Sequence, residues 1–237
     1  MLNSYKEFRY ELKYKINPGE LHKFYSWLST LSMSSHKKNE TFIKKQHQSN
    51  LINNIYFDNL NHDMAFDNIY GSLYKKKLRI RWYGSDSNIK NVRLEIKEKF
   101  NNLVRKNVET ISTELDLSRS AVRSSSFQSL FQRSNLKFKL TYSKLFQPTL
   151  FNQYSRDYYI TANEKVRITL DQRIFYSNPD KIVINSRKNS NNFDIICEVK
   201  FGKSDFDYAM SLVNSIPFKR SRYSKYSTGL NNTACRG

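Results

Sequence analysis

The sequence predicts an α+β protein in which antiparallel strands close into a β-barrel and helices pack on its outside. At least five segments alternate charged and apolar residues, so each would form a strand with one charged and one apolar face. VRLEIKEKF at 92–100 is the clearest example. Hydrophobic residues make up 38% of the 237 residues, enough for a core without disulfides or metals.

The first half of the chain alternates strands with short helical segments. The segment 5–16 is a predicted strand, and NPGELHKFYSWLSTL begins a helix at Asn17 with Pro18 in its first turn. A polar stretch at 32–50 then precedes further elements. These are a strand at 51–59, a turn or short helix at 63–72, strands at 73–84 and 91–99, and a strand of less regular pattern at 103–112.

The second half opens with a mainly helical prediction for 112–148, with Leu130, Phe131, Leu136 and Leu140 buried. Short strands follow at 154–160, 164–176, 181–185 and 193–202. A helix begins at Asp205 and ends before Pro217. We interpret residues 1–237 as one domain with a core at about 5–230 and a short basic C-terminal tail without obvious regular structure.

The charged strand faces favour a closed barrel over an open sheet. In an open sheet these faces would meet solvent, and charges of both signs would be mixed along them. In LYKKKLRIRWYG the positions 75, 77, 79 and 81 on one face are all cations. In a barrel such faces point inward, the apolar faces pack against helices, and no edge is exposed.

The charge balance indicates an anionic partner. Lys and Arg number 40 against 21 Asp and Glu, a formal charge of +19 that would repel itself in a compact fold. Like charges about 4 Å apart repel by about 4 kcal/mol at a typical effective dielectric constant, so a basic lumen must hold water and anions. Phosphate-rich molecules fit best, because Arg binds their oxygens in bidentate pairs.

Several classes of protein are disfavoured. Only Cys197 and Cys235 occur, which indicates a reducing compartment, and we expect a cytoplasmic protein. No signal peptide or integral membrane segment is predicted, so any membrane contact would be peripheral and made through a partner protein of unknown identity. Four scattered His lack zinc-site spacing, and six Gly supply no phosphate-binding loop.

Eight motifs in order carry a resemblance to a known family. They are RYELKYKI, IYFDN, KLRIRWYG, RLEIKEK, YSRDYYI, VRITLD, CEVKF and RYSKY. Their order resembles the VTC (vacuolar transporter chaperone) domain of polyphosphate polymerases, within the triphosphate tunnel metalloenzyme (CYTH-like) superfamily. The chain looks like a stand-alone member of the bacterial type, with the resemblance covering roughly residues 5–230.

The resemblance implies that ATP binds in a basic tunnel and passes its γ-phosphate to a growing polyphosphate chain, with Mn²⁺ or Mg²⁺ as cofactor. Such transfer needs positioning and charge neutralisation more than a protein nucleophile. The matching catalytic cations are Lys13, Arg79, Arg81, Lys97, Arg156 and Arg167. Further phosphate contacts are Lys106, Tyr154, Arg222, Ser224 and Lys225. The metal-binding match is Glu198, with Glu11 and Glu95 as additional candidates.

Two departures bear on the reaction. Arg222 stands where the family more usually has a lysine. The hydrolytic branch of the superfamily begins Glu-x-Glu-x-Lys, whereas this chain reads Arg9-x-Glu11-x-Lys13, which disfavours metal-activated water and favours holding a long polyanion. Glu11 and Glu95 either bind metal or pair with neighbouring basic residues.

Three alternatives remain beside the polymerase. A triphosphatase acting on inorganic or nucleoside triphosphates would use the same tunnel, and a non-catalytic polyphosphate-binding protein would use the same cations. A nucleic-acid-binding protein is the least favoured. It would depend on outward lysines such as Lys44, Lys45 and Lys76 rather than on Arg79, Arg81 or Arg167.

Overall fold

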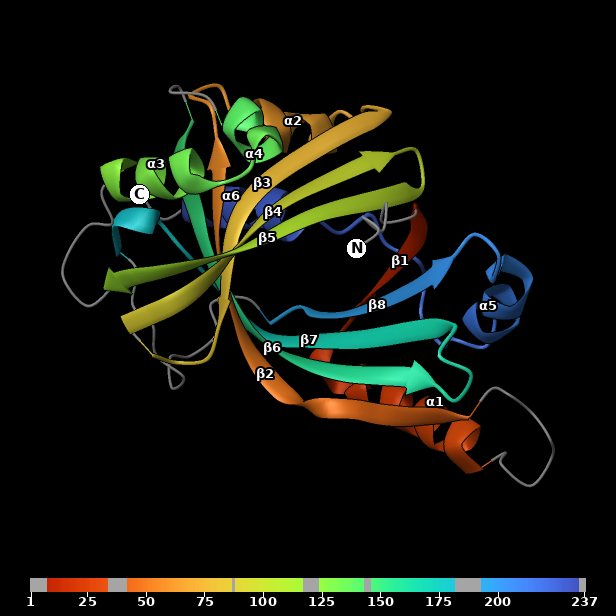
Figure 1. Cartoon of the computed structure of the whole chain (residues 1–237). Coiled ribbons are helices and arrows are strands. Elements are labelled where there is room, and N and C mark those ends of the chain that lie inside the picture. Colours follow the sequence, from red (N-terminus) through yellow and green to blue (C-terminus); the bar gives the residue numbers. More distant parts are fainter. Residues whose placement is uncertain are drawn as a thin grey trace.

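Eight antiparallel strands form one sheet that closes on itself into a ring in the computed structural model (Figure 1). The structure describes residues 8–33, 42–86, 88–116, 124–142, 146–181 and 193–234. The hydrogen-bonded order is β1-β5-β4-β3-β2-β6-β7-β8. The strands are β1 Arg9–Ile16, β2 Ile43–Asp58, β3 Tyr74–Tyr83, β4 Asn88–Phe100, β5 Leu103–Asp116, β6 Gln147–Thr161, β7 Val166–Ser177 and β8 Ile195–Gly202. The predicted ring of antiparallel strands is confirmed.

The ring closes through a short seam between β1 and β5. Arg9 pairs with Val104 and Tyr10 with Leu103, whereas the opposite edge of β1 pairs with β8 along its whole length, from Arg9–Gly202 to Ile16–Ile195. The seam therefore leaves most of β5 to pair with β4 alone.

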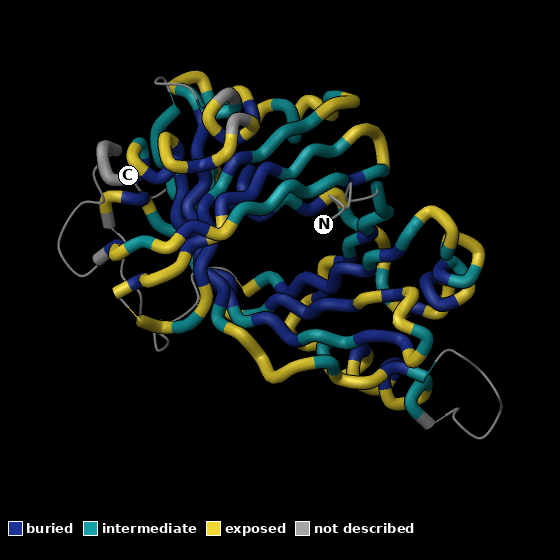
Figure 2. Tube along the Cα trace, viewed as in Figure 1, coloured by how far each residue is buried: buried dark blue, intermediate teal, exposed yellow. Residues whose placement is uncertain are grey.

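Most helices lie outside the ring, as predicted, and pack on its apolar faces (Figure 1). The C-terminal helix is the exception, because it packs against Tyr56 and Leu150 on the same face as Arg79. One hydrophobic cluster joins the outward residues of β1, β7 and β8 to α1 and α5, and a second joins β2, β3, β4 and β6 to α2, α3 and α6. Figure 2 shows buried backbone following the strands around the ring. The helical elements are η1 Pro18–Glu20, α1 Leu21–Met33, α2 Asp63–Ile69, α3 Ser124–Arg133, α4 Leu136–Thr141, η3 Pro179–Lys181, α5 Phe206–Val213 and α6 Lys225–Ala234.

Strand alternation separates the two faces as the sequence predicts. In β3, Leu78, Ile80 and Trp82 are buried in the outer cluster, while Arg79 and Arg81 lie on the other face. The paired β4 residues repeat the pattern, because Arg79 lies opposite Glu95 and Leu78 opposite Ile96. Cys197 likewise packs outward, and it is fully buried in the cluster with α1 and α5.

Three strands, β2, β5 and β6, extend well beyond the bounds that the sequence predicts. β2 begins at Ile43, inside the stretch interpreted as a polar connection, because 43–50 pairs with the end of β6 although most of its residues are exposed on both faces. An all-polar strand has no hydrophobic period by which to detect it. β6 begins at Gln147 rather than 154, and β5 continues to Asp116. In the described part of the predicted mainly helical 112–148, the helices are α3 and α4.

The basic tail is irregular only in its first part. Residues 221–224 have no regular secondary structure, as predicted, but residues 225–234 form helix α6, which the prediction missed. Ser224 caps this helix by accepting a hydrogen bond from the backbone N–H of Ser227 at 3.3 Å. Gly229 sits against β6 and β7, where an added Cβ would lie 2.5 Å from Leu150 and 2.6 Å from Tyr176. Tertiary contact therefore holds a helix whose own sequence, KYSTGLNNTA, is a poor helix former.

The remaining helix predictions are mostly confirmed. Leu130 and Phe131 are buried, whereas the side chains of Leu136 and Leu140 and the predicted strand residues 182–185 lie outside the described residues. α5 follows Asp205 as expected.

Candidate phosphate-binding site

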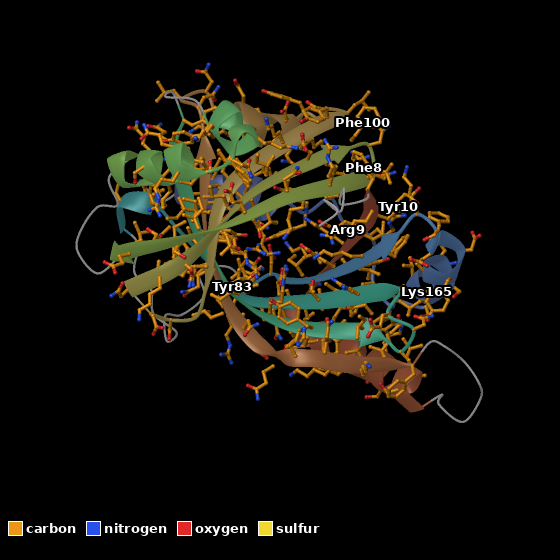
Figure 3. All side chains as sticks on the ribbon, in the orientation of Figure 1. Phe8, Arg9, Tyr10, Tyr83, Phe100 and Lys165 are labelled. Atoms are coloured by element: carbon orange, nitrogen blue, oxygen red, sulfur yellow. The ribbon has the colours of Figure 1, made fainter. Side chains whose placement is uncertain are left out.

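Basic side chains gather on the inner face of the ring, and most of them form ion pairs with four carboxylates. Figure 3 shows side chains rich in nitrogen atoms in the space that the strands enclose. Contacts among described residues connect nine cations to this network or to α6 beside it. The cations are Lys13, Lys77, Arg79, Arg81, Lys97, Lys106, Arg156, Lys200 and Lys225, and the carboxylates are Glu11, Glu95, Asp171 and Glu198.

Glu95 organises the cations of β3 and β5. Arg79 donates from Nε and Nη2 to Oε2 of Glu95 at 2.8 and 2.6 Å, and Lys106 Nζ lies 3.1 Å from Oε1. Glu95 is fully buried, which by itself would raise the pKa of its carboxyl, but Arg79, Arg81 and Lys106 outweigh burial and hold the pKa well below its ordinary value. This carboxylate stays charged and fixes three cations.

Arg81 is aimed by neutral partners. Its Nε donates to Asn54 Oδ1 at 2.9 Å, its Nη2 donates to Tyr154 Oη at 3.1 Å, and its Nη1 lies 3.9 Å from Glu95. Burial would raise the pKa of the Tyr154 hydroxyl, yet the charges of Arg156 and Arg81 lower it. Because Asn54 and Tyr154 add no formal charge, Arg81 keeps more of its positive potential than Arg79 does.

Glu11 and Glu198 meet at Lys13. Lys13 Nζ lies 3.7 Å from Glu11 and 3.8 Å from Glu198, and it donates to the backbone carbonyl of Tyr223 at 2.8 Å. Lys97 donates to both oxygens of Glu11, at 2.6 and 2.9 Å. Burial raises the pKa of the Glu11 carboxyl, but Lys97 and Lys13 outweigh it and hold the pKa well below the ordinary value.

Glu198 and Asp171 form the third cluster, with α6 as a contributor. Arg156 donates to both oxygens of Asp171 at 2.5 and 2.7 Å. Lys225 of α6 pairs with Asp171 and lies 3.5 Å from Glu198. Lys200 lies 2.7 Å from Glu198. Although burial disfavours its charge, these cations keep the pKa of Glu198 well below the ordinary value.

Three lysines of the site are short of compensating charge. Burial outweighs the attraction of Glu11 and lowers the pKa of Lys97 to about 7. Burial likewise outweighs the attraction of Glu95 and lowers the pKa of Lys106 to about 7. For Lys77, burial and then Lys13, Lys97 and Arg79 lower the pKa well below its ordinary value. Its Nζ donates to the hydroxyl of Ser224 at 2.7 Å. An arriving anion would stabilise the charged form of all three lysines.

The structure brings most of the predicted site residues into this network. The exceptions are Arg167 and Arg222, which are exposed and make no ion pair with another described residue. Arg167 sits at the far end of β7, opposite Lys200, so it shares the inner face without reaching the three clusters. Arg222 lies close enough to Lys99 to help lower the pKa of that lysine.

Sequence reasoning missed Lys77, Asp171 and Lys200 as site residues. The signal was present in each case, because Lys77 alternates with Arg79 and Arg81, Asp171 lies two positions after Thr169 in VRITLD, and Lys200 follows Glu198 by two. Two tyrosines were also missed: Tyr56, which accepts from Arg79 at 3.1 Å, and Tyr223, which offers its carbonyl to Lys13.

The described residues contain no group of three or more His, Cys, Asp and Glu side chains that could hold a metal ion. Glu11 and Glu198 are nevertheless suitable ligands, because both contact one ammonium group and both have pKa values held below the ordinary value. Two carboxylates can bind Mg²⁺ or Mn²⁺ when phosphate oxygens and water complete the shell. In the described part of the chain, Glu95 has no second carboxylate on its cations, since its oxygens are engaged by Arg79 and Lys106.

Comparison with known proteins identifies the family. Residues 8–233 match the VTC domain. This chain belongs to the VTC domain family. No curated protein matches the sequence.

Two solved structures resemble this VTC domain along its length. The PH1819 protein from Pyrococcus horikoshii OT3 shares 13% identity at a TM-score of 0.51, covering 94% of this chain and 98% of its own. A candidate adenylate cyclase from Bacillus halodurans shares 11% identity at a TM-score of 0.51, covering 93% of this chain and 95% of its own. At these identities the likeness shows the fold alone. No helix among the described residues has the length and apolar character to cross a bilayer.

Proposed function

We propose that this VTC domain is a polyphosphate polymerase that transfers the γ-phosphate of ATP to a growing polyphosphate chain inside the ring, which then acts as a triphosphate tunnel. The observation that carries the proposal is the excess of nine cations over four carboxylates on the inner face and on α6 beside it. Membership of the VTC domain family supports it.

The arrangement suits a substrate with charge repeated along its length. The basic groups come from six strands and from α6, so successive phosphates would meet a donor at each step. Arg79, Arg81 and Arg156 offer planar guanidinium groups for phosphate oxygens, while Lys97 and Lys106 offer mobile point charges. Together these groups hold the γ-phosphoryl and the acceptor in line and neutralise the charge of the transition state.

Glu11 and Glu198 would hold the divalent cation, Mn²⁺ or Mg²⁺, beside Lys13. When bound there, it would supply Lewis-acid neutralisation of phosphate charge. The residues' own contribution is to keep both carboxylates ionised and oriented, which Lys97 does for Glu11 and Lys200 does for Glu198.

Transfer to a phosphate is favoured over transfer to water by the charge around Glu11. A hydrolase of this architecture needs carboxylates to activate water, whereas Arg9 stands two residues before Glu11, where the hydrolytic motif has a second carboxylate. A terminal phosphate of a polyanion is already ionised and needs no base.

The test is to incubate the purified protein with ATP and Mn²⁺, or with Mg²⁺, and to separate long-chain polyphosphate from free phosphate. Wild-type protein should make long chains, and Glu198→Gln should lower the rate by about 10²-fold or more, as losses of single charge-stabilising groups do. Glu98→Gln is the matched control, because Glu98 lies on the outward face of β4 and pairs with Arg105 and Lys137.

Free phosphate without chains would identify a triphosphatase. Neither product, with tight binding of polyphosphate retained, would identify a binding protein. Either result overturns the polymerase proposal.

A further inference from the structure

Exposed apolar side chains concentrate at one tip of the molecule. Of eleven large hydrophobic residues exposed in the described part of the chain, six come from α2, the segment after it and the adjoining strand ends. We call these six the apolar patch: Phe66, Ile69, Tyr70, Leu73, Tyr74 and Phe100. Tyr70 is 79% exposed and Leu73 68% exposed. Concentration of this kind marks an interaction site more often than scattered exposure does.

The residues of the patch come from neighbouring backbone segments. Phe66 and Tyr70 stack at 5.7 Å within α2, and α2 packs beside β3 (Figure 1). Tyr74 lies directly opposite Phe100 on β4, and the backbone N–H of Asn101 donates to the carbonyl of Leu73 at 2.9 Å. The patch therefore covers α2 and the β4–β5 hairpin end together, at the end of the ring where Figure 3 labels Phe100 and Phe8.

Lysines adjoin the patch on both faces of the sheet. Lys75 lies directly opposite Lys99, one position along from the Tyr74–Phe100 pair, and like charges in this position repel. Lys76 lies two residues after Tyr74 and shares the outer face of β3 with it. Of the nearby carboxylates, Glu98 is paired with Arg105 and Lys137. Asp63 and Asp67 accept hydrogen bonds from the uncharged Asn59 and Ser72 and therefore keep their charge. The three lysines outnumber these two carboxylates, so the net charge around the patch is positive.

We propose that the apolar patch docks this protein directly on an anionic lipid surface. Tyrosine and aliphatic side chains partition into the boundary between headgroups and acyl chains, and each lysine near an anionic leaflet adds attraction. A second copy of the chain is a poor occupant, because two molecules of charge +19 would bring Lys75, Lys76 and Lys99 against their equals. Nucleic acid would match the lysines and leave the aliphatic residues in water.

Docking in this way orients the ring. Arg9 and Tyr10 pair with Val104 and Leu103, next to the β4–β5 turn that carries Phe100, so the β1–β5 seam and the patch lie at the same end of the ring. The proposal concerns where the protein sits and does not depend on the reaction that the ring performs.

The test is sedimentation of the full-length protein with phosphatidylcholine vesicles that contain or lack phosphatidylserine. Wild-type protein should bind the anionic vesicles and be released by salt. The double variant Tyr70→Ser with Leu73→Ser should lose at least about tenfold in affinity, because two side chains leave the interface. Lys76→Gln should lose about fivefold, corresponding to one lysine at a charged leaflet.

The matched control is Phe193→Ser, which removes an aromatic residue that is 78% exposed and outside the patch, and which should bind as wild type does. Circular dichroism of each variant checks folding. An absence of wild-type binding to anionic vesicles would overturn the proposal and leave a protein partner as the occupant. Equal binding by the double variant would also overturn it, as would complete displacement by tripolyphosphate, because the lipid would then be held by the ring.

Discussion

At the residue scale, each carboxylate of the network holds two or more cations in position and offsets part of their positive potential. Arg79 makes two hydrogen bonds to Glu95, and Arg156 makes two to Asp171. Breaking one partner of such a buried pair leaves an uncompensated charge, which is strongly destabilising. The acids are therefore as much a part of the phosphate site as the bases are.

Lys106 makes anion binding depend on pH. Burial lowers its pKa from 10.5 to about 7 in the free protein, so above pH 7 it is mostly neutral until an anion restores its proton. Tripolyphosphate should bind with uptake of protons at about pH 8, and its affinity should fall as pH rises from about 7 to 9. Calorimetry in metal-free buffers of different ionisation heats measures the uptake.

Lys106→Arg should take up fewer protons, because arginine stays charged throughout this range. Lys90→Arg, at an exposed position of β4, should behave as wild type does. Equal uptake in all three proteins would show that Lys106 does not titrate on binding. The same shift makes the fold more stable as pH rises from about 7 toward 10.5, because over that range the unfolded chain holds the proton that the folded chain has lost.

At the scale of elements, the C-terminal helix α6 adds side chains to the site that the strands form. It supplies Lys225 to Asp171 and Glu198, and Tyr226 donates to Asp58 at 2.8 Å. Gly229 allows the close approach to Leu150 and Tyr176 that sets the position of the helix.

Gly229→Ala should displace α6, because its Cβ would overlap both neighbours. We expect a loss of about 1–3 kcal/mol in the free energy of unfolding, the usual cost of overpacking, measured by urea denaturation. Affinity for tripolyphosphate should fall as well, since Lys225 moves with the helix. Gly19→Ala is the control, because nothing lies within 4 Å of the added Cβ. Unchanged stability in Gly229→Ala would mean that α6 adjusts without cost.

At the scale of the whole molecule, net charge and ring closure oppose each other. A charge of +19 resists compaction, and the ring concentrates part of that charge on one face. Anions that bind only the folded ring relieve this repulsion.

Tripolyphosphate should therefore raise the melting temperature. At a concentration 100 times its Kd it should add about 2.7 kcal/mol to the free energy of unfolding. The double variant Arg79→Ala with Arg81→Ala should respond far less. Lys44→Ala with Lys45→Ala, which removes two exposed cations of β2, should respond as wild type does. Differential scanning fluorimetry measures all three. Equal shifts in both double variants would assign the anion to the outer surface.

The sequence by itself determined the two faces of the strands, the wealth of cations on the inner one and the resemblance to the VTC domain. A period of two is a local property, so β3 and β4 could be assigned face by face before any contact was known. Most of the candidate phosphate ligands followed from that assignment. Arg167 did not join them, because its place along β7 puts it at the exposed end, which alternation alone does not reveal.

Only the tertiary structure decided which charges meet. Lys97 reaches Glu11 across 86 residues of sequence, and Lys13 reaches the carbonyl of Tyr223 across 210. Such pairs depend on closure of the ring and on its register, and no local pattern encodes either. The polar start of β2 and the helix α6 were missed for the same reason: long-range pairing and close packing hold them in place, and their own residues carry no periodic signal.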